Sequence, residues 1–302
     1  MANIILLAIC LAAGIGLRKT GRFPAATPAA LNGFVIHISL PALAILHIHN
    51  LGIDPSLALT AAMAWLLFGC AWALFATIGT ALKMDRRRIG ALVLVAGLGN
   101  TSFVGLPMIE AYYGKEHLGV GIIADQLGTF MTLSTLGILA ATIYSSGNVT
   151  PGQMARKIAL FPPFQALVLA LLLKPVPFPA WTVAILQKLG DTLTPLALVS
   201  VGFQLHFGGL KEVLKPLSAG LAYKLLLGPA LIYLLYVTIL GSTGTVTQIT
   251  VFEAAMAPMI TAGIIAVDHD LEPPLVAMLV GIGIPLSFVT LYFWHLFLAG
   301  AA

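Results

Sequence analysis

Long apolar runs constrain the fold of this chain more than any other feature. The stretch from Ser56 to Leu82 contains no charged residue. A transmembrane helix needs roughly 20 consecutive apolar residues, whereas the strands of a membrane barrel alternate over about ten. The chain is 59% hydrophobic and 9% charged, and soluble domains are roughly one quarter charged. Because only helices and closed barrels span lipid, we predict an all-α integral membrane protein of the lipid bilayer.

Windows of bilayer length predict about ten transmembrane helices. Their expected ranges are 2–17, 29–50, 56–82, 89–113, 117–144, 158–174, 180–207, 216–240, 246–267 and 272–298. Every second loop between these ranges is rich in Lys and Arg. Since positive residues favour the cytoplasm, we expect both termini outside, in a cell membrane such as the bacterial inner membrane. The acidic loop at Asp268–Asp270 is then an exception on the cytoplasmic side.

The charge and the cysteines exclude two classes of function. The formal net charge is +4, but the basic residues sit at segment ends, so they indicate topology and no nucleic-acid partner. Cys10 and Cys70 lie in apolar runs, where buried inert thiols are expected instead of a disulfide framework. The sequence leaves open whether the protein is a monomer or a homodimer.

The fourth expected helix contains a stretch that a helix tolerates poorly. Gly97, Gly99, Gly105 and Pro107 fall in the middle of the apolar run Ile89–Tyr113. Proline removes an N–H and clashes with the preceding turn, so we expect the helix to break at Pro107. Unwound backbone survives at this depth only where protein or a water-filled cavity satisfies it. A kink without a ligand is the alternative.

A second interrupted segment favours a ligand-binding site over a kink without a ligand. The tripeptide Pro107-Met-Ile recurs at Pro258-Met-Ile, in the middle of the ninth expected helix. The sequence Phe-Pro-Ala also precedes both the second and the seventh expected helix. We therefore predict two inverted five-helix repeats, 1–150 and 151–302, with broken crossing helices 4 and 9. Interrupted helices at matching places in inverted repeats are typical of a transport site.

The expected chemistry of this site is recognition of a small organic anion. The second half of each broken helix should present free N–H groups and the positive end of its dipole. We expect these groups on Met108, Ile109, Met259, Ile260 and Thr261. The predicted substrate-binding residues are Asn100, Thr101, Ser102, Gly105, Pro107, Met108, Pro258, Met259 and Thr261.

Ionisable residues inside membrane spans are candidates for ion coupling. Asp125 and Glu253 are predicted to carry a coupling proton or Na⁺. Asp125 has the alternative of a structural pairing with Gln126, and Glu253 that of tying the crossing together near Asn100. Lys224 is expected to snorkel to the membrane surface, with a functional role as the alternative. The histidines show no grouping typical of a metal site, so no metal or cofactor is predicted.

The segments Asn100-Thr-Ser-Phe-Val-Gly-Leu-Pro107 and Glu253-Ala-Ala-Met-Ala-Pro258 resemble those of the auxin efflux carrier family, which includes bacterial malate or malonate permease-like members. The resemblance implies a fold shared with bile-acid sodium symporters. In that fold, helices 1, 2, 6 and 7 form a scaffold, and helices 3–5 and 8–10 form a transport domain. Glu253 is similar in position to a glutamate that binds sodium there, although Ala257 and Pro258 stand where those relatives carry amides.

These observations predict a secondary active transporter, by symport or antiport, that moves a mono- or dicarboxylate by alternating access. A passive channel or a membrane sensor is the alternative. An enzyme is less favoured, because the sequence contains no zinc pattern, no Ser–His–Asp order and no phosphate loop.

Overall fold

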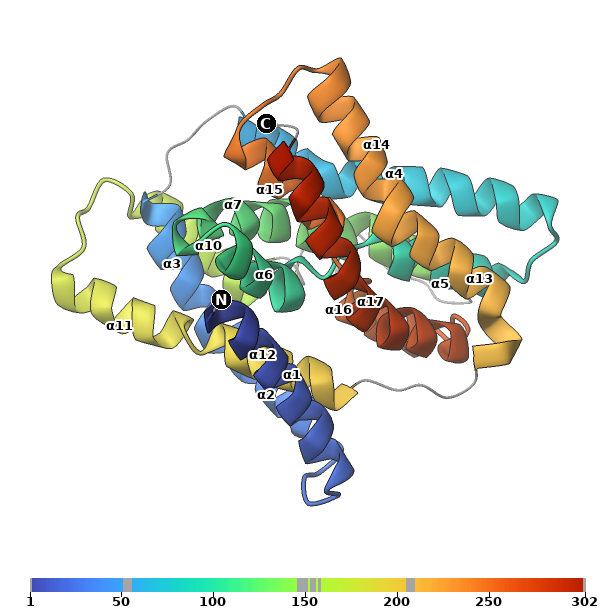
Figure 1. Cartoon of the computed structure of the whole chain (residues 1–302), viewed down its shortest axis with the longest axis horizontal. Helices are drawn as coiled ribbons and strands as arrows, with labels where there is room; N and C mark the ends of the chain where they lie inside the picture. The colour runs from blue at the N-terminus through green and yellow to red at the C-terminus, as the bar shows by residue number, and fades with distance from the viewer. Residues whose placement is uncertain are drawn as a thin grey trace. The chain divides into compact units, whose positions relative to one another are not determined.

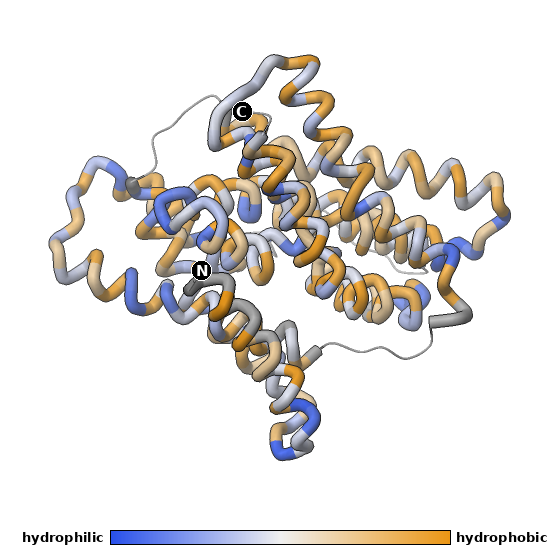
Figure 2. The backbone as a smooth tube through the Cα atoms, in the orientation of Figure 1, coloured by the Kyte–Doolittle hydropathy of each residue, from blue (hydrophilic) through white to orange (hydrophobic). Residues whose placement is uncertain are grey.

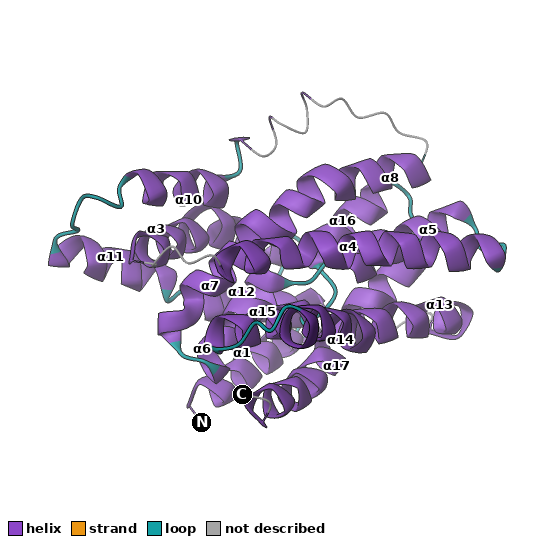
Figure 3. Ribbon diagram, turned by 90° about the horizontal axis from the view of Figure 1, so that it is seen from above, coloured by secondary structure: helices purple, strands orange, loops and turns teal. Residues whose placement is uncertain are grey.

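The computed structural model describes residues 2–50, 56–145, 152, 156, 159–204 and 210–300. Every regular element in these ranges is a helix, and Figure 3 draws no strand among them. The prediction of an all-helical protein is confirmed. The predicted boundary between the repeats, at 150/151, lies outside the described residues, as does the loop at 51–55.

Packing divides the chain into two compact units. Unit 1 comprises residues 1–53, 102–122 and 156–205, and unit 2 comprises 54–101, 123–155 and 206–302. The chain therefore passes from unit 2 into unit 1 between Thr101 and Ser102, within the fourth expected helix, and returns after Ile122.

In unit 1, α1 and α12 pack side by side (Figure 1). The α-helices of this unit are α1 (Ala2–Lys19), α2 (Thr27–Phe34), α3 (Leu40–Asn50), α6 (Leu106–Tyr112), α7 (Leu118–Ile123), α10 (Pro162–Leu172), α11 (Ala180–Gly190) and α12 (Leu193–Gln204). The π-helix η1 (Val35–Ser39) joins α2 to α3, and the 3-10 helix η4 (Lys115–His117) precedes α7. The close approach of α1 to α12 depends on Gly14, where any Cβ would collide with the α12 backbone.

In unit 2, α15 packs against α4 and α14. Its α-helices are α4 (Ser56–Ala81), α5 (Arg86–Ala91), α8 (Ile138–Tyr144), α13 (Leu210–Ala222), α14 (Gly228–Tyr233), α15 (Thr245–Ala254), α16 (Ile260–Asp268) and α17 (Pro273–Gly300). Its π-helices are η2 (Leu92–Ala96), η5 (Ala124–Phe130), η6 (Leu133–Gly137), η7 (Tyr223–Leu227) and η8 (Leu234–Ile239). A further π-helix, η3 (Thr101–Gly105), begins at the junction of the units.

Five helical runs among the described residues are long and apolar enough to cross a bilayer. They are Thr27–His49, Leu57–Ala81, Lys115–Tyr144, Val213–Ile239 and Pro273–Gly300. Figure 2 shows these runs mostly in hydrophobic colours, with polar residues gathered at turns. Large apolar side chains such as Phe293, 63% exposed, lie on the surface, as expected of a protein surrounded by lipid. The count of ten helices and their inverted repeat stay predictions.

Two ion pairs join the first turn of α5 to the acidic loop that precedes α17 in unit 2. Arg87 pairs with Asp270 at 2.5 Å, and the guanidinium of Arg88 holds both carboxylate oxygens of Glu272. This hydrogen bonding raises the pKa of Arg88 above its ordinary value. Asp270 and Glu272 have positive φ angles of 54° and 46°, a conformation that costs free energy in residues with a side chain. The acidic loop that is an exception to the charge rule thus lies against the arginines at the same end of unit 2.

Candidate functional site

Two helix interruptions within unit 2 meet and pair through their backbones. Gly99 and Pro258 form an isolated antiparallel bridge. The Asn100 N–H donates to the Ala257 carbonyl at 2.8 Å, and the Met259 N–H donates to the Leu98 carbonyl at 3.1 Å. We call the segments 97–100 and 255–259 the paired breaks. This pairing satisfies unwound backbone N–H and C=O groups that would otherwise be unpaired within the bilayer, because each break supplies hydrogen-bond partners to the other.

The residues at the bridge suit this close approach. Pro258 has no N–H, but the hydrogen bonds beside the bridge come from its neighbours, so none is lost. Gly283 of α17 leaves room for the Pro258 ring, since a Cβ there would lie 2.6 Å from Pro258 Cδ. A Cβ on Gly99 would lie 3.1 Å from Lys224 Nζ. Glycine at 283 is therefore a packing requirement, whereas a Cβ at 99 would need the Lys224 ammonium to shift by a few tenths of an ångström.

The prediction that the fourth helix breaks at Pro107 is wrong. The interruption comes earlier, at Leu98–Asn100, and the chain is helical again from Thr101 through Tyr112. Pro107 lies at the start of α6, directly after the π-helix η3. A wider π turn relieves the clash between a proline ring and the preceding turn, so Pro107 is accommodated without a break.

The expected set of free N–H groups changes accordingly. Met108 and Ile109 lie within a continuous helical path, so they are not the first turn of the second half-helix. The Met259 N–H is used in the bridge. Ile260 and Thr261 do open α16, in whose first turn N–H groups have no helical partner.

Asp125 is held by two hydrogen bonds beside the paired breaks. The Thr101 hydroxyl donates to one carboxylate oxygen at 2.6 Å, and the Gln126 amide donates to the other at 2.5 Å. Asp125 is 3% exposed. The structural pairing with Gln126 that the sequence left open is therefore present, and Thr101 adds to it.

Glu253 lies in the last turn of α15 and is completely buried. Neither of its carboxylate oxygens has a hydrogen-bond partner among the described residues. It interacts electrostatically with Asp125 and Lys224. The alternative in which Glu253 ties the two breaks together by hydrogen bonds is therefore not what the structure shows.

The prediction that Lys224 snorkels to the surface is wrong. The side chain is 2% exposed, and its ammonium donates to the Ala254 carbonyl at 2.8 Å, at the end of α15. The helix begins at Leu210 instead of near residue 216, which moves Lys224 away from the helix end. A lysine inside an apolar run was the feature of the sequence that could have indicated a buried site. Its contact with α15 could not be predicted from that run alone.

The structure gathers only part of the predicted substrate site. Unit 2 contains the bridge residues and their neighbours Asn100, Thr101, Pro258, Met259 and Thr261. Unit 1 contains Ser102, Gly105, Pro107 and Met108. Asn100 and Thr101 are each 1% exposed. Within the described part of the chain, no three His, Cys, Asp or Glu side chains are grouped to hold a metal ion.

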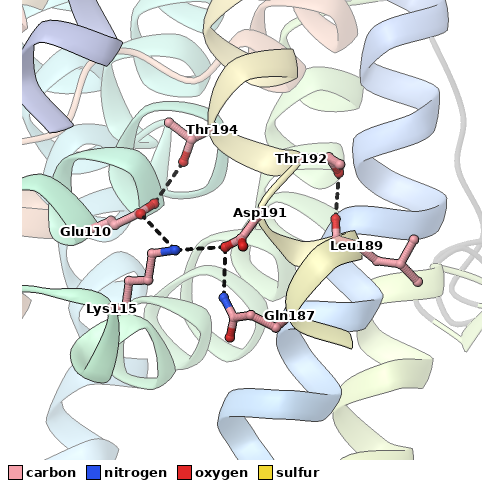
Figure 4. Close-up of polar contacts among 7 residues, drawn as sticks. All are labelled: Glu110, Lys115, Gln187, Leu189, Asp191, Thr192 and Thr194. Carbon is pink, nitrogen blue, oxygen red and sulfur yellow. Dashed lines mark hydrogen bonds and ion pairs between the residues drawn. The ribbon is translucent and has the colours of Figure 1, made fainter. Parts of the chain in front are cut away.

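Unit 1 has a polar cluster of its own around Lys115 (Figure 4). The Lys115 ammonium lies 2.8 Å from Asp191 and 3.6 Å from Glu110. Glu110 also accepts a hydrogen bond from Thr194, and Asp191 one from Gln187. Glu110 thereby joins α6 to α12. The side chains of Lys115 and Asp191 are about half exposed, so this cluster is a weaker candidate than the paired breaks.

The fold and the paired breaks define a multi-pass membrane transporter, and comparison with known proteins agrees. Residues 1–295 match the model of a family described as membrane transport protein. An uncharacterized transporter of Methanothermobacter thermautotrophicus is 28% identical over 217 residues, 71% of this chain and 70% of the relative. An uncharacterized transporter of Methanocaldococcus jannaschii is 25% identical over 218 residues, 70% of this chain and 69% of the relative.

The chain belongs to this membrane transport protein family, the auxin efflux carriers, which confirms the resemblance read from the sequence. The family and both relatives are transporters, so the protein is a transporter with a small-molecule substrate and not an enzyme.

Proposed function

We propose that the protein is a secondary active transporter that moves a small organic anion, a mono- or dicarboxylate, by alternating access. The observation that carries this proposal is the buried pairing of two interrupted helices in unit 2, with Glu253, Asp125 and Lys224 beside it. Interrupted helices are the usual way in which secondary transporters build a site within the bilayer.

The anion has two sources of stabilisation at the paired breaks. The nine-residue helix α16 begins with Ile260 and Thr261, whose N–H groups lie at the positive end of the helix dipole. Asn100 supplies a side-chain amide on the other break, which can donate to a carboxylate. These groups can attract an anion through backbone and amide N–H donors.

The coupling ion is proposed to act at Glu253, with Asp125 beside it. An ionised carboxylate without hydrogen bonds is costly in a buried site, so Glu253 binds a proton or sits near a cation. Asp125 already has two hydrogen-bond donors. We therefore assign the exchangeable proton to Glu253 in preference to Asp125, with sodium as the competing coupling ion.

The proposal includes the larger architecture expected from the sequence. That architecture has ten helices in two inverted repeats, residues 1–150 and 151–302, with both termini outside the cell membrane. A passive channel or a membrane sensor is the competing function, since family membership alone does not distinguish a carrier from either.

A thermal-shift screen of the purified protein with mono- and dicarboxylates, with and without sodium, tests the proposal. A ligand raises the melting temperature of the state to which it binds. We expect a saturable increase for at least one carboxylate in the wild type and in Asn32→Ala, and a loss of this increase in Asn100→Ala. Asn32 is the matched control, because it accepts a hydrogen bond from Ser200 in unit 1. An equal response of all three proteins would remove Asn100 from the site.

A further inference from the structure

We propose that Lys224 is the built-in cation of the paired breaks, so that transport requires no sodium or other metal cation there. This inference rests on the proposed function, and it narrows the choice of coupling ion left open above. The Lys224 ammonium occupies the position at the end of α15 that a free cation would otherwise fill.

The Lys224 ammonium lies at the C-terminal end of α15. Lys224 Nζ lies 2.8 Å from the Ala254 carbonyl oxygen, where α15 ends. The last carbonyls of a helix have no helical partner and form the negative end of its dipole. In transporters with interrupted helices, such carbonyls are the groups that coordinate a sodium ion. Here a lysine already occupies one of them.

Lys224 is almost completely buried. The side chain is 2% exposed and is among the largest fully buried side chains of the described protein. A buried ammonium is costly unless negative charge and hydrogen-bond acceptors compensate it. The nearest break also leaves little space, because even a methyl group on Gly99 would lie 3.1 Å from Nζ. A lysine is therefore packed into the paired breaks.

Two buried carboxylates, Glu253 and Asp125, lie near Lys224 at the paired breaks. Lys224 interacts electrostatically with Glu253, and Glu253 in turn with Asp125. No ion pair within 4.0 Å joins Lys224 to Glu253 among the described residues, so the two side chains are not in direct contact. With one cation already present, a metal cation at this carbonyl would meet repulsion from Lys224.

Removal of the ammonium should create a requirement for a free cation. We compare melting temperatures in sodium chloride and in N-methylglucamine chloride at equal ionic strength. The wild type should show no difference between the two salts. Lys224→Ala should melt roughly 10 °C lower in N-methylglucamine, because an uncompensated charge stays buried. Sodium or methylammonium should restore part of this loss in a saturable manner.

Two further proteins keep the test decisive if Lys224→Ala folds poorly. Lys224→Met/Glu253→Gln removes both charges, so it should be more stable than Lys224→Met alone and should not respond to sodium. Lys215→Met removes an exposed lysine of the same helical run, Val213–Ile239, and should behave as the wild type in both salts. A double variant no more stable than Lys224→Met, or a saturable stabilisation of the wild type by sodium, would overturn the proposal.

The test contains no substrate, so its outcome is separate from that of the proposed function. A negative carboxylate screen with the expected cation response would contradict the anion transporter and support the role of Lys224. A positive screen with a sodium-stabilised wild type would do the reverse.

Discussion

At the scale of single residues, the polar groups at the paired breaks differ in how well they are satisfied. Asp125 has two hydrogen-bond donors, and Lys224 has a carbonyl acceptor. Glu253 has no hydrogen-bond partner among the described residues. A carboxylate of the first kind stabilises a structure, whereas one of the second kind is a candidate for reversible protonation.

The hydrogen bond between Thr101 and Asp125 gives a prediction about stability. Thr101→Val removes the hydroxyl that donates to a buried carboxylate, which should cost about 1–3 kcal/mol. Thr101→Ser keeps the donor and should stay close to the wild type. Denaturant unfolding of the purified variants measures the difference. Equal stability of the Val and Ser variants would show that this bond contributes little.

Glu253→Gln gives a prediction about coupling. Glutamine keeps the shape of the side chain and removes its charge, so the variant should still exchange substrate across the membrane. Accumulation driven by a pH gradient should disappear, since no exchangeable proton is left at this position. Uptake into proteoliposomes with and without an imposed gradient measures both. Accumulation at the wild-type level would remove Glu253 from the mechanism.

At the scale of helices, the sequence predicted that two helices are interrupted but misplaced one interruption. Proline and glycine mark a weak point in an apolar run, so the existence of the break followed from composition. Its position depended on η3, which absorbs Pro107, and on the pairing of Gly99 with Pro258. The bridge joins segments far apart in the chain, and the π turn has no recognised sequence pattern, so neither could be predicted from the apolar run alone.

The packing of α1 against α12 gives a prediction with a close control. A Cβ on Gly14 would lie 2.8 Å from Phe203 N and 2.9 Å from Gly202 Cα, and it would also collide with the Val199 carbonyl. Gly14→Ala should therefore destabilise the protein by about 1–3 kcal/mol. Gly16→Ala meets nothing within 4 Å and should be neutral or slightly stabilising. Melting temperatures of the two variants provide the comparison.

At the scale of the whole molecule, charge distribution predicts the orientation in the membrane. The arginines of α5 and the acidic loop meet through Arg87 and Arg88, so one end of unit 2 carries both. The sequence could not show this pairing, because acidic residues count little in the charge rule. The repeat symmetry and the count of ten helices depend on how the segments are placed in space, which composition does not determine.

Cysteine labelling in intact cells tests the orientation. In a variant without Cys10 and Cys70, a cysteine at Arg87 should resist an impermeant reagent, because this loop is predicted to be cytoplasmic. A cysteine at the exposed Thr243, in a loop predicted to be outside, should react and serves as the control. The opposite labelling pattern would reverse the topology.

We propose that this protein is a carrier for small carboxylates, and counterflow in proteoliposomes distinguishes a carrier from a channel. Vesicles are loaded with unlabelled malate or malonate and diluted into a trace of the labelled anion. A carrier that alternates access exchanges the two, so the account predicts a transient accumulation of label that saturates with substrate concentration. Flux that rises linearly with concentration, without accumulation from exchange, would identify a channel and contradict the account.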